Sequence, residues 1–385
     1  MKALVLSFSP VEFDSRVQRQ VESVAEKFDV VFFDSHGLAK LPRGQKFDPT
    51  EVWNPLPGFR GGLSPIPRIL RGLFLFFGFF NAFFWMPGGI GWRIRKKLRE
   101  SFVLDFDLVI VNDVDPLPLA FGVARGAPVV ADLHEFAPGE EKAVGIHQWA
   151  RVRYRRWLCR VYLPKCRDIT VVSKSVGDMY RRDFDVSPTV LFSVPHFNRL
   201  EPSPIREDVI HLVHHGIYKA DRGIEALIEG FGPIQDRFVL NLVLSGAPLD
   251  KLRNLVSDLG ISADRIFFHK FRTPRNLIPF LNQFDLEVIF IPPDVPNYEA
   301  ALPNKFFEAV QARLGIVSSP LVEIQKIVNE EKIGIVADSF QPEELTRVFS
   351  SITREIVAEW KAGSHDVARK FSWDKLAPNY ADYVR

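Results

Sequence analysis

Residues 301–317 combine side chains that suit the binding of a phosphorylated ligand. Pro303 favours the first position of a helix, and the free backbone N–H groups at a helix start can hold a diphosphate. Lys305 adds a positive charge at this point, and Glu308, one turn later, is placed to accept hydrogen bonds from ribose hydroxyls. The alternative is an amphipathic helix whose charged side chains lie on its solvated face.

His134 is the second candidate for chemistry. It follows the apolar residues 129–131 and lies between Asp132 and Glu135, at the carboxyl end of a predicted strand. Open parallel sheets bind ligands at the carboxyl ends of their strands, so we expect this histidine to reach a ligand. The alternative is a buried histidine whose ring binds a backbone carbonyl.

Asp113 and Asp115 follow another predicted strand, residues 107–112. Because Asp115 precedes Pro116, the pair predicts a helix cap followed by a first-turn proline. We therefore assign these two carboxylates a structural role.

The elements that must position these residues alternate between short apolar runs and helical patterns, which predicts parallel α/β sheets. In the first half, Asp14 and Ser15 predict a helix cap before an apolar face formed by Val17, Val21 and Val24. Strands are predicted there at residues 2–8, 29–34, 107–112, 127–132, 169–173 and 189–193. The second half has predicted strands at residues 209–214, 238–244, 265–269, 286–291 and 315–318, with helices near 222–230, 248–258, 274–282 and 304–312.

Length and composition predict two domains. A chain of 385 residues with 46% hydrophobic residues exceeds what one core usually serves. Residues 195–208 have the proline-rich, polar composition of a linker. We therefore place an N-terminal domain at residues 1–200, with an aromatic insert at about 59–105, and a C-terminal domain at residues 201–370. Residues 371–385 are predicted to form a helix that packs back on the first domain.

Charge, cysteines and motifs exclude several functional classes. Lys and Arg number 49 against 47 Asp and Glu, and a net charge of +2 gives no global field for nucleic acid. Cys159 and Cys166 stand without a second pair, which argues against a zinc site or a disulfide scaffold and favours a reducing cytosol. Hydrolase, kinase and dinucleotide-binding motifs are absent. Residues 2–8 lack a cleavage site and are expected to form a strand rather than a signal peptide.

An uncharged, strongly aromatic segment lies between Arg71 and Arg93. Its length would permit a transmembrane helix, but a single crossing would place strands 2–8 and 107–112 of one sheet on opposite sides of the membrane. Basic residues flank it on both sides, which is typical of a segment lying in an anionic membrane interface. We assign this membrane contact to Phe76, Phe79, Phe80, Phe83, Phe84 and Trp85. The alternative is a core or dimer helix.

Several short segments share the order of motifs of one enzyme family. They are Phe13-Asp14-Ser15-Arg16-Val17, Val129-Val130-Ala131-Asp132-Leu133-His134-Glu135, His215-Gly216 with Arg222-Gly223, Leu244-Ser245-Gly246, Phe284-Asp285-Leu286, Pro303-Asn304-Lys305-Phe306-Phe307-Glu308-Ala309 with Gly315-Ile316-Val317, and Phe371-Ser372-Trp373. Together they resemble the retaining glycosyltransferases of family 4. The resemblance implies an α/β protein with the GT-B fold, in which two Rossmann-like, doubly wound domains face each other across a cleft.

The resemblance also implies roles for individual residues. His134 would lie beside the transferred sugar and the donor phosphate, while the cationic Arg222 and Lys305 would hold the leaving diphosphate. The implied donor-binding residues are Gly216, Lys219, His269, Lys270, Phe271, Pro303, Asn304, Lys305, Phe306 and Glu308. A plain loop is the alternative for residues 269–271. The resemblance implies neither a metal nor a cofactor, because family 4 enzymes generally work without one. It also implies no protein nucleophile, because the leaving diphosphate itself can help to deprotonate the acceptor.

We therefore expect a retaining, hexosyltransferase-type enzyme of polysaccharide biosynthesis. It would move a sugar from a nucleotide sugar to a lipid-linked or surface-glycan acceptor, in the cytoplasm at the inner face of the plasma membrane, with a peripheral contact to anionic lipid and no nucleic-acid partner. The alternatives are a catalytically inactive GT-B-like binding or scaffold subunit and, with less support, a GT-B epimerase or phosphorylase.

Two departures from the family pattern motivate the inactive alternative. Many members carry a glutamate at the position of Ala300, and Glu299 is out of step with that position by one residue. The family often has Arg directly after the glycine that is Gly216 here, whereas this chain has Ile217, with Lys219 as the candidate substitute.

Overall fold

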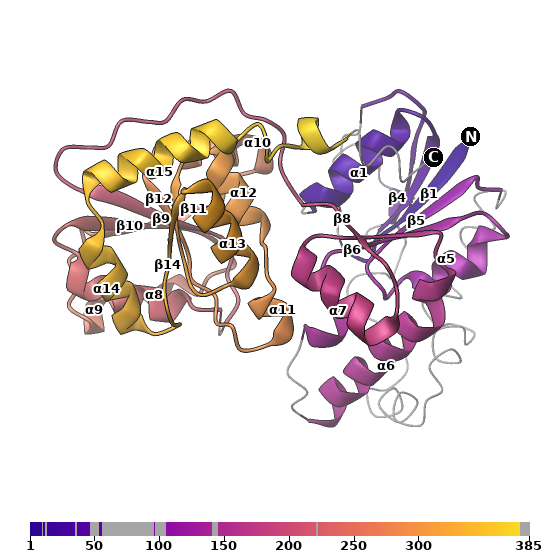
Figure 1. Cartoon of the computed structure of the whole chain (residues 1–385), viewed down its shortest axis with the longest axis horizontal. Helices are drawn as coiled ribbons and strands as arrows, with labels where there is room; N and C mark the ends of the chain where they lie inside the picture. The colour runs from indigo at the N-terminus through magenta and orange to yellow at the C-terminus, as the bar shows by residue number, and fades with distance from the viewer. Residues whose placement is uncertain are drawn as a thin grey trace. The chain divides into compact units, whose positions relative to one another are not determined.

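The chain consists of two compact units, each built on its own sheet (Figure 1). The first comprises Met1–Phe192 and Ala377–Arg385, and the second Ser193–Leu376. The computed structural model describes residues 1–9, 11, 14–34, 37–46, 54–55, 96, 105–140, 145–220 and 222–377. The second unit begins at Ser193, two residues before the predicted linker, and residues 191–209 form neither helix nor strand.

The first unit contains a sheet with the strand order β4-β3-β2-β1-β5-β6-β7-β8. The β2–β3 and β3–β4 pairs are antiparallel, and the other neighbouring pairs are parallel. Its strands are β1 (Lys2–Leu6), β2 (Asp29–Phe33), β3 (Gly37–Leu41), β4 (Asn54–Pro55), β5 (Leu108–Asn112), β6 (Val129–Leu133), β7 (Asp168–Val171) and β8 (Thr189–Val190). Its helices are α1 (Ser15–Ala25), α5 (Leu117–Ala124), α6 (Ile146–Tyr162) and α7 (Lys174–Phe184), with 3-10 turns η2 (Ala137–Gly139) and η3 (Leu163–Lys165).

Helix α1 begins where the sequence predicts it. The Asp14 side chain accepts a hydrogen bond from the backbone N–H of Val17 and so caps the helix. Val17, Val21 and Val24 are completely buried, which confirms the predicted apolar face. Strand β5 is buried along its whole length, as expected for a parallel strand with helices on both sides of its sheet.

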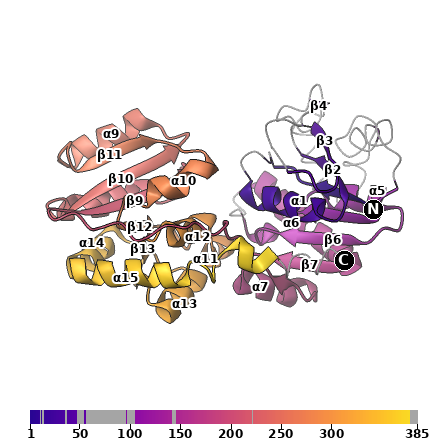
Figure 2. The ribbon, with the colours of Figure 1, turned by 90° about the horizontal axis from the view of Figure 1, so that it is seen from above.

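The second unit contains a parallel sheet in the order β11-β10-β9-β12-β13-β14. Its strands are β9 (Ile210–Ile217), β10 (Phe238–Ser245), β11 (Ile266–Lys270), β12 (Leu286–Ile289), β13 (Gly315–Ser318) and β14 (Gly334–Val336). Its helices are α8 (Ile224–Phe231), α9 (Leu249–Asp258), α10 (Pro274–Leu281), α11 (Pro296–Glu299), α12 (Asn304–Gln311), α13 (Val322–Glu331), α14 (Pro342–Ser351) and α15 (Arg354–Val367), with the turn η4 (Gly232–Ile234). Helices lie on both sides of this sheet (Figure 2).

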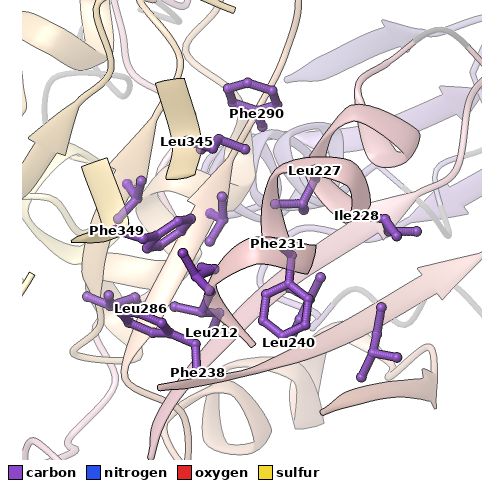
Figure 3. Close-up of a cluster of buried hydrophobic side chains, with 14 of the residues drawn as sticks. Leu212, Leu227, Ile228, Phe231, Phe238, Leu240, Leu286, Phe290, Leu345 and Phe349 are labelled. Carbon is purple, nitrogen blue, oxygen red and sulfur yellow. The ribbon is translucent and has the colours of Figure 1, made fainter. Parts of the chain in front are cut away.

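The hydrophobic core of the second unit lies between its sheet and the helices α8 and α14. Figure 3 shows Phe231 of α8 and Phe349 of α14 beside strand residues Leu212, Phe238 and Leu286. All five side chains are completely buried. Burying one such side chain contributes about 1.5–3 kcal/mol to the stability of the fold, so this layer stabilises the sheet. Helix α12 packs against strands β12 and β13 of the same sheet.

Residues 371–376 belong to the second unit. The backbone N–H of Trp373 donates to the carbonyl of Pro195 at 2.8 Å, and the Phe371 ring lies 5.5 Å from that of Phe307. Residues 378–385 lie outside the described part of the chain, so the packing of segment 371–385 on the first domain stays a prediction.

Candidate active site

His134 directly follows β6 and is held from its backbone and its ring. Its N–H donates to Asp113 Oδ1 at 2.9 Å, and its Nε2–H donates to Asn112 Oδ1 at 3.1 Å. The Asp14, Asp113 and Asp132 carboxylates lie within 3.6–3.9 Å of its ring nitrogens. The side chain keeps 17% of its surface exposed, so the ring is both anchored and reachable.

Asp132 is the buried anchor of this cluster. Arg16 donates to both of its oxygens, at 2.6 and 2.9 Å, and Gln20 and Thr170 donate to it at 3.0 and 2.6 Å. Burial alone would raise the pKa of Asp132, but the Arg16 guanidinium and His134 hold it well below its usual range. Arg16 and Gln20 can both reach Asp132 because they lie one turn apart on the same face of α1.

The surrounding carboxylates make His134 a cation at neutral pH. Burial disfavours the charged imidazole, but Asp113, Asp132 and Asp14 outweigh burial and raise the pKa of His134 to about 9. Asp113 itself has the left-handed backbone angle φ of 64°, which is uncommon outside glycine and frequent at functional sites. The sequence predicted His134 at the carboxyl end of a strand, and the structure adds three carboxylates around its ring that favour the charged imidazolium.

The predicted capping role of Asp115 is wrong. Helix α5 is preceded by Pro116 without a side-chain cap, and the Asp115 carboxylate instead accepts a hydrogen bond from Arg155 at 2.9 Å. The same guanidinium binds Glu140 at 2.6 Å, so it links the loop after β5 to η2 and α6. A buried guanidinium needs more than one acceptor, which is why it competes successfully for Asp115.

Lys305 and Glu308 both lie on α12, in the second unit. The helix begins at Asn304, as the predicted range 304–312 has it, but Pro303 is not its first residue: it has an extended ψ of 153° and stands before the first turn. Lys305 Nζ lies over the end of β9, 3.5 Å from where a Cβ on Gly216 would stand. Gly216 has φ of 137°, a backbone conformation that favours glycine.

A neutral histidine orients Lys305. His214 Nδ1–H donates to the carbonyl of Val288 at 2.7 Å, which leaves Nε2 to accept a hydrogen bond from Lys305 Nζ at 3.1 Å. Burial and the adjacent ammonium keep the pKa of His214 well below its ordinary value. Burial lowers the pKa of Lys305 to about 8, with Arg222 acting in the same direction and the Glu287 and Glu308 carboxylates opposing it.

Glu308 is bound by a second histidine. His215 Nε2 lies 3.0 Å from Glu308 Oε2, and its Nδ1 lies 2.9 Å from Glu287 Oε2. Burial opposes the charged ring, but the two carboxylates raise the pKa of His215 to about 9. Glu308 keeps 20% of its side chain exposed, whereas Glu287 is completely buried.

Arg222 lies on the turn between β9 and α8. Its Nε donates to the hydroxyl of Tyr298 at 3.0 Å, and its guanidinium carbon lies 4.7 Å from the centre of that ring. The neighbouring Gly223 must be glycine, since a Cβ there would meet the carbonyl oxygen of Phe290 at 2.3 Å. The tight approach to the end of β12 is therefore built into the Arg222-Gly223 pair.

The other predicted donor-binding residues lie in different settings. Phe306 is completely buried with its ring against Phe307, so its side chain packs in the core instead of facing a ligand. His269 is part of β11, not a loop, and binds Asn241 at 2.9 Å. Lys270 ends β11, in register with the strand ends of β10 and β9. The remaining members, Lys219, Phe271 and Asn304, are exposed.

The two departures from the family pattern keep their significance in the structure. Ala300 is buried directly after α11, and Glu299 beside it is exposed. Ile217 ends β9 with 65% of its surface exposed. Neither position supplies a charge to the cluster around Lys305.

The aromatic segment lies outside the described residues, and with it Phe76, Phe79, Phe80, Phe83, Phe84 and Trp85. Among the helices that are described, none has the length and apolar character needed to cross a membrane. In the described ranges, no group of three or more His, Cys, Asp or Glu side chains has the arrangement of a metal site.

Sequence reasoning gave His214, His215 and Glu287 no role of their own. The available signal was a charged residue inside a predicted apolar strand, Glu287, whose buried carboxylate requires a cationic partner. Arg16 and Gln20 were missed as well, although their i, i+4 spacing places both on the buried face of α1.

Two family models match consecutive parts of the chain. Residues 22–197 match the model described as Glycosyltransferase Family 4, and residues 210–354 match Glycosyl transferases group 1. The two matches fall on the first and the second unit. None of the curated proteins matches the sequence.

Solved structures with a similar fold are glycosyltransferases. Sucrose-phosphate synthase from Thermosynechococcus elongatus is 15% identical with a TM-score of 0.72, covering 99% of this chain and 97% of its own. HepE from Anabaena, in complex with UDP-glucose, is 14% identical with a TM-score of 0.67, covering 100% and 99%. WaaG, a glycosyltransferase involved in lipopolysaccharide biosynthesis, is 14% identical with a TM-score of 0.64 and the same coverage. The similarity confirms the GT-B fold.

Proposed function

Because the chain belongs to the family 4 glycosyltransferases with the GT-B fold, we propose that it moves a sugar from a nucleotide sugar to an acceptor with retention of configuration. The observation that carries this proposal is the pairing of Lys305 and Glu308 on the first turns of α12. A cation at a helix start suits a diphosphate, and a carboxylate one turn later suits the ribose of the same ligand. HepE, which has a similar fold, was solved with UDP-glucose, and this supports a nucleotide-sugar donor.

The cations of the second unit can stabilise the leaving nucleoside diphosphate. Departure of a nucleoside diphosphate leaves negative charge on its phosphate oxygens, and preoriented cations stabilise that charge in the transition state. With its pKa lowered to about 8, Lys305 is still mostly protonated at pH 7. Arg222 supplies a second cationic group, a guanidinium held by the hydroxyl and the ring of Tyr298.

We assign His134 an electrostatic role and not that of a general base. An imidazolium with a pKa of about 9 has no free lone pair at pH 7, so it cannot accept a proton from an acceptor hydroxyl. It can donate a charge-assisted hydrogen bond to a sugar hydroxyl or a phosphate oxygen. Deprotonation of the acceptor would then fall to the leaving diphosphate, on the same face of the sugar.

For the acceptor we propose a lipid-linked or surface glycan, in polysaccharide biosynthesis at the cytoplasmic face of the plasma membrane. WaaG, with a similar fold, is involved in lipopolysaccharide biosynthesis, which supports a glycan acceptor. The membrane contact rests on the basic-aromatic-basic order of residues 60–99 in the sequence. We further propose hexosyl transfer without a metal or other cofactor.

A thermal-shift panel of nucleotide sugars tests the proposal. A ligand at 100 times its Kd adds about 2.7 kcal/mol to the free energy of unfolding, which is readily measured. UDP-, GDP- and ADP-linked hexoses should be compared with the free hexoses at equal concentration. Stabilisation by one nucleotide sugar but not by its sugar alone supports the proposal, and no stabilisation by any of them contradicts it.

The inactive scaffold subunit remains the second candidate, because Ala300 and Ile217 replace charged residues of the family pattern. Hydrolysis separates the two functions. Transferases release donor sugar slowly to water even without acceptor, so steady release of nucleoside diphosphate from the stabilising donor identifies an enzyme. A donor that binds and is never turned over, with or without glycan acceptors, identifies a binding subunit.

A further inference from the structure

We propose that His215 is a positioning residue for Glu308: it bridges Glu287 and Glu308 and thereby holds the Glu308 carboxylate for the ribose of the donor. The inference deepens the proposed function and rests on it. It assigns a role to a residue that touches no ligand itself and that acts only through the carboxylate it binds.

The bridge requires a ring that donates from both nitrogens. Nδ1 faces Glu287 Oε2 at 2.9 Å and Nε2 faces Glu308 Oε2 at 3.0 Å, and ionised carboxylates only accept hydrogen bonds. A neutral histidine has one N–H and could satisfy one of the two. The imidazolium satisfies both, and its charge is shared between two carboxylates.

Glu287, at the buried end of the bridge, is rigidly held. Glu287 lies in the middle of β12 with no exposed surface, and its second oxygen accepts a hydrogen bond from the backbone N–H of His215 at 3.4 Å. Both β9 and β12 are central strands of the sheet, so the ring of His215 is fixed from two strands. A side chain fixed in this way can orient a partner with little loss of conformational entropy on ligand binding.

Glu308, at the other end of the bridge, is partly exposed to solvent. His215 engages Oε2 of Glu308 and leaves Oε1 unengaged by the ring, while 20% of the Glu308 side chain is exposed. A free glutamate samples many rotamers, and fixing it in one of them has an entropic cost. His215 meets this cost during folding, before the donor arrives.

Three cationic side chains and two carboxylates form and surround the bridge. From β9 come His215, as a cation, and His214, which is neutral; from β12 comes Glu287; and from α12 come Lys305 and Glu308. Arg222, on the turn after β9, adds its charge near Lys305. Removing His215 alone would leave two carboxylates facing each other in a buried site, which disturbs folding as well as binding.

The test therefore removes the buried pair together. In the double variant His215→Leu/Glu287→Leu both buried charges disappear, a replacement that is often neutral for stability. Glu287→Gln is the conservative control: its amide can donate to Nδ1, so that a neutral ring still donates from Nε2 to Glu308. Glu308→Ala, alone and added to the double variant, completes a cycle.

The readout is discrimination at the ribose, measured by calorimetric titration of each variant with UDP, GDP and ADP and with their 2′-deoxy and 3′-deoxy forms. For the nucleotide that binds best, the parent and Glu287→Gln should prefer the full ribose by about tenfold, as expected for a hydrogen bond to a charged group. The double variant and Glu308→Ala should each lose most of this preference. The triple variant should lose no more than Glu308→Ala alone.

Three results would overturn the inference. The first is a folded double variant that keeps the parent's ribose preference, and the second is a triple variant in which the two losses multiply. If the double variant does not fold, His215→Asn replaces it, because its shorter side chain can reach Glu287 but not Glu308. The third is therefore an unchanged ribose preference in His215→Asn. A parent that binds none of the three nucleotides would instead contradict the proposed function, and the inference with it.

Discussion

Replacing Asp113 by Asn should lower the pKa of the His134 imidazole while leaving its backbone contact in place. The Asn side chain keeps an oxygen that can accept the hydrogen bond which His134 N–H now donates to Asp113 Oδ1 at 2.9 Å. The substitution removes the negative charge of the Asp113 carboxylate, whose second oxygen, Oδ2, lies 3.9 Å from His134 Nδ1. The variant therefore isolates the electrostatic contribution of one carboxylate.

The size of the effect follows from this distance. Two unit charges about 4 Å apart interact by about 1 kcal/mol in water and about 4 kcal/mol near a protein surface. The Asp113 side chain is 37% exposed, so water screens it and we take the lower part of this range, about 1–2 kcal/mol. At about 1.4 kcal/mol per pKa unit, the His134 midpoint should fall from about 9 by about one unit.

A pH titration of histidine Cε1–H signals by NMR measures this midpoint directly. His134→Gln identifies the signal by its disappearance, and Asp178→Asn, which removes an exposed carboxylate paired with Lys174 and Arg181, is the matched control. A parent midpoint near the ordinary value of about 6.5 would refute the charged histidine and reopen its role as a base. An Asp113→Asn midpoint equal to the parent's would refute Asp113 as its partner.

Three further predictions concern other parts of the molecule. Lys305→Ala should weaken nucleotide-sugar binding about tenfold or more without lowering Tm, and in the parent donor affinity should decline as pH rises through about 8, where Lys305 loses its proton. Calorimetry checks both, with Lys326→Ala, at an exposed lysine of α13, as the control, and an unchanged affinity of Lys305→Ala removes Lys305 from the site. Arg16→Leu should lower the free energy of unfolding by about 3–5 kcal/mol, because it removes the cationic partner of the buried Asp132 carboxylate. Arg43→Leu, at an exposed arginine, should change the free energy of unfolding little, and equal urea midpoints for the two variants would contradict the prediction. Serine at four positions of the aromatic segment should abolish binding to anionic vesicles and spare activity on a soluble acceptor, and parental co-sedimentation or outright unfolding would show that these side chains do not contact lipid. The four positions are Phe79, Phe80, Phe83 and Phe84.

The order of elements was predictable because local signals and long-range packing agree. The predicted strand at 315–318 and the helix at 304–312 match β13 and α12 to within one residue, since a continuous apolar run and a proline define their limits. The predicted strand at 189–193 shrinks to the two residues of β8, which lies at the edge of the sheet. Strand β3 pairs antiparallel with β2 and was not predicted, because its residues, Gly37–Leu41, contain a lysine and a glycine and form no continuous apolar run.

For the candidate site, the sequence indicates where residues lie on strands and helices but not their protonation states. His134 and Lys305 were identified from strand and helix ends together with the family resemblance, which need no knowledge of neighbours. That His214 is neutral while His215 is charged follows from which carbonyl or carboxylate lies 2.7–3.0 Å away, and those partners come from β12 and α12, far along the chain. Side-chain partners at such sequence separation leave no periodic signal.

The stereochemistry of the released sugar tests the central claim most directly. Proton NMR can follow the parent protein as it hydrolyses the stabilising nucleotide sugar and record the first anomer that appears, before mutarotation mixes the two. A retaining glycosyltransferase releases the sugar with the configuration it had in the donor, together with the nucleoside diphosphate, and we expect both from the parent and far less of both from His134→Ala. Release of the opposite anomer would contradict the retaining mechanism, and no release of nucleoside diphosphate from any donor would contradict the enzymatic function itself.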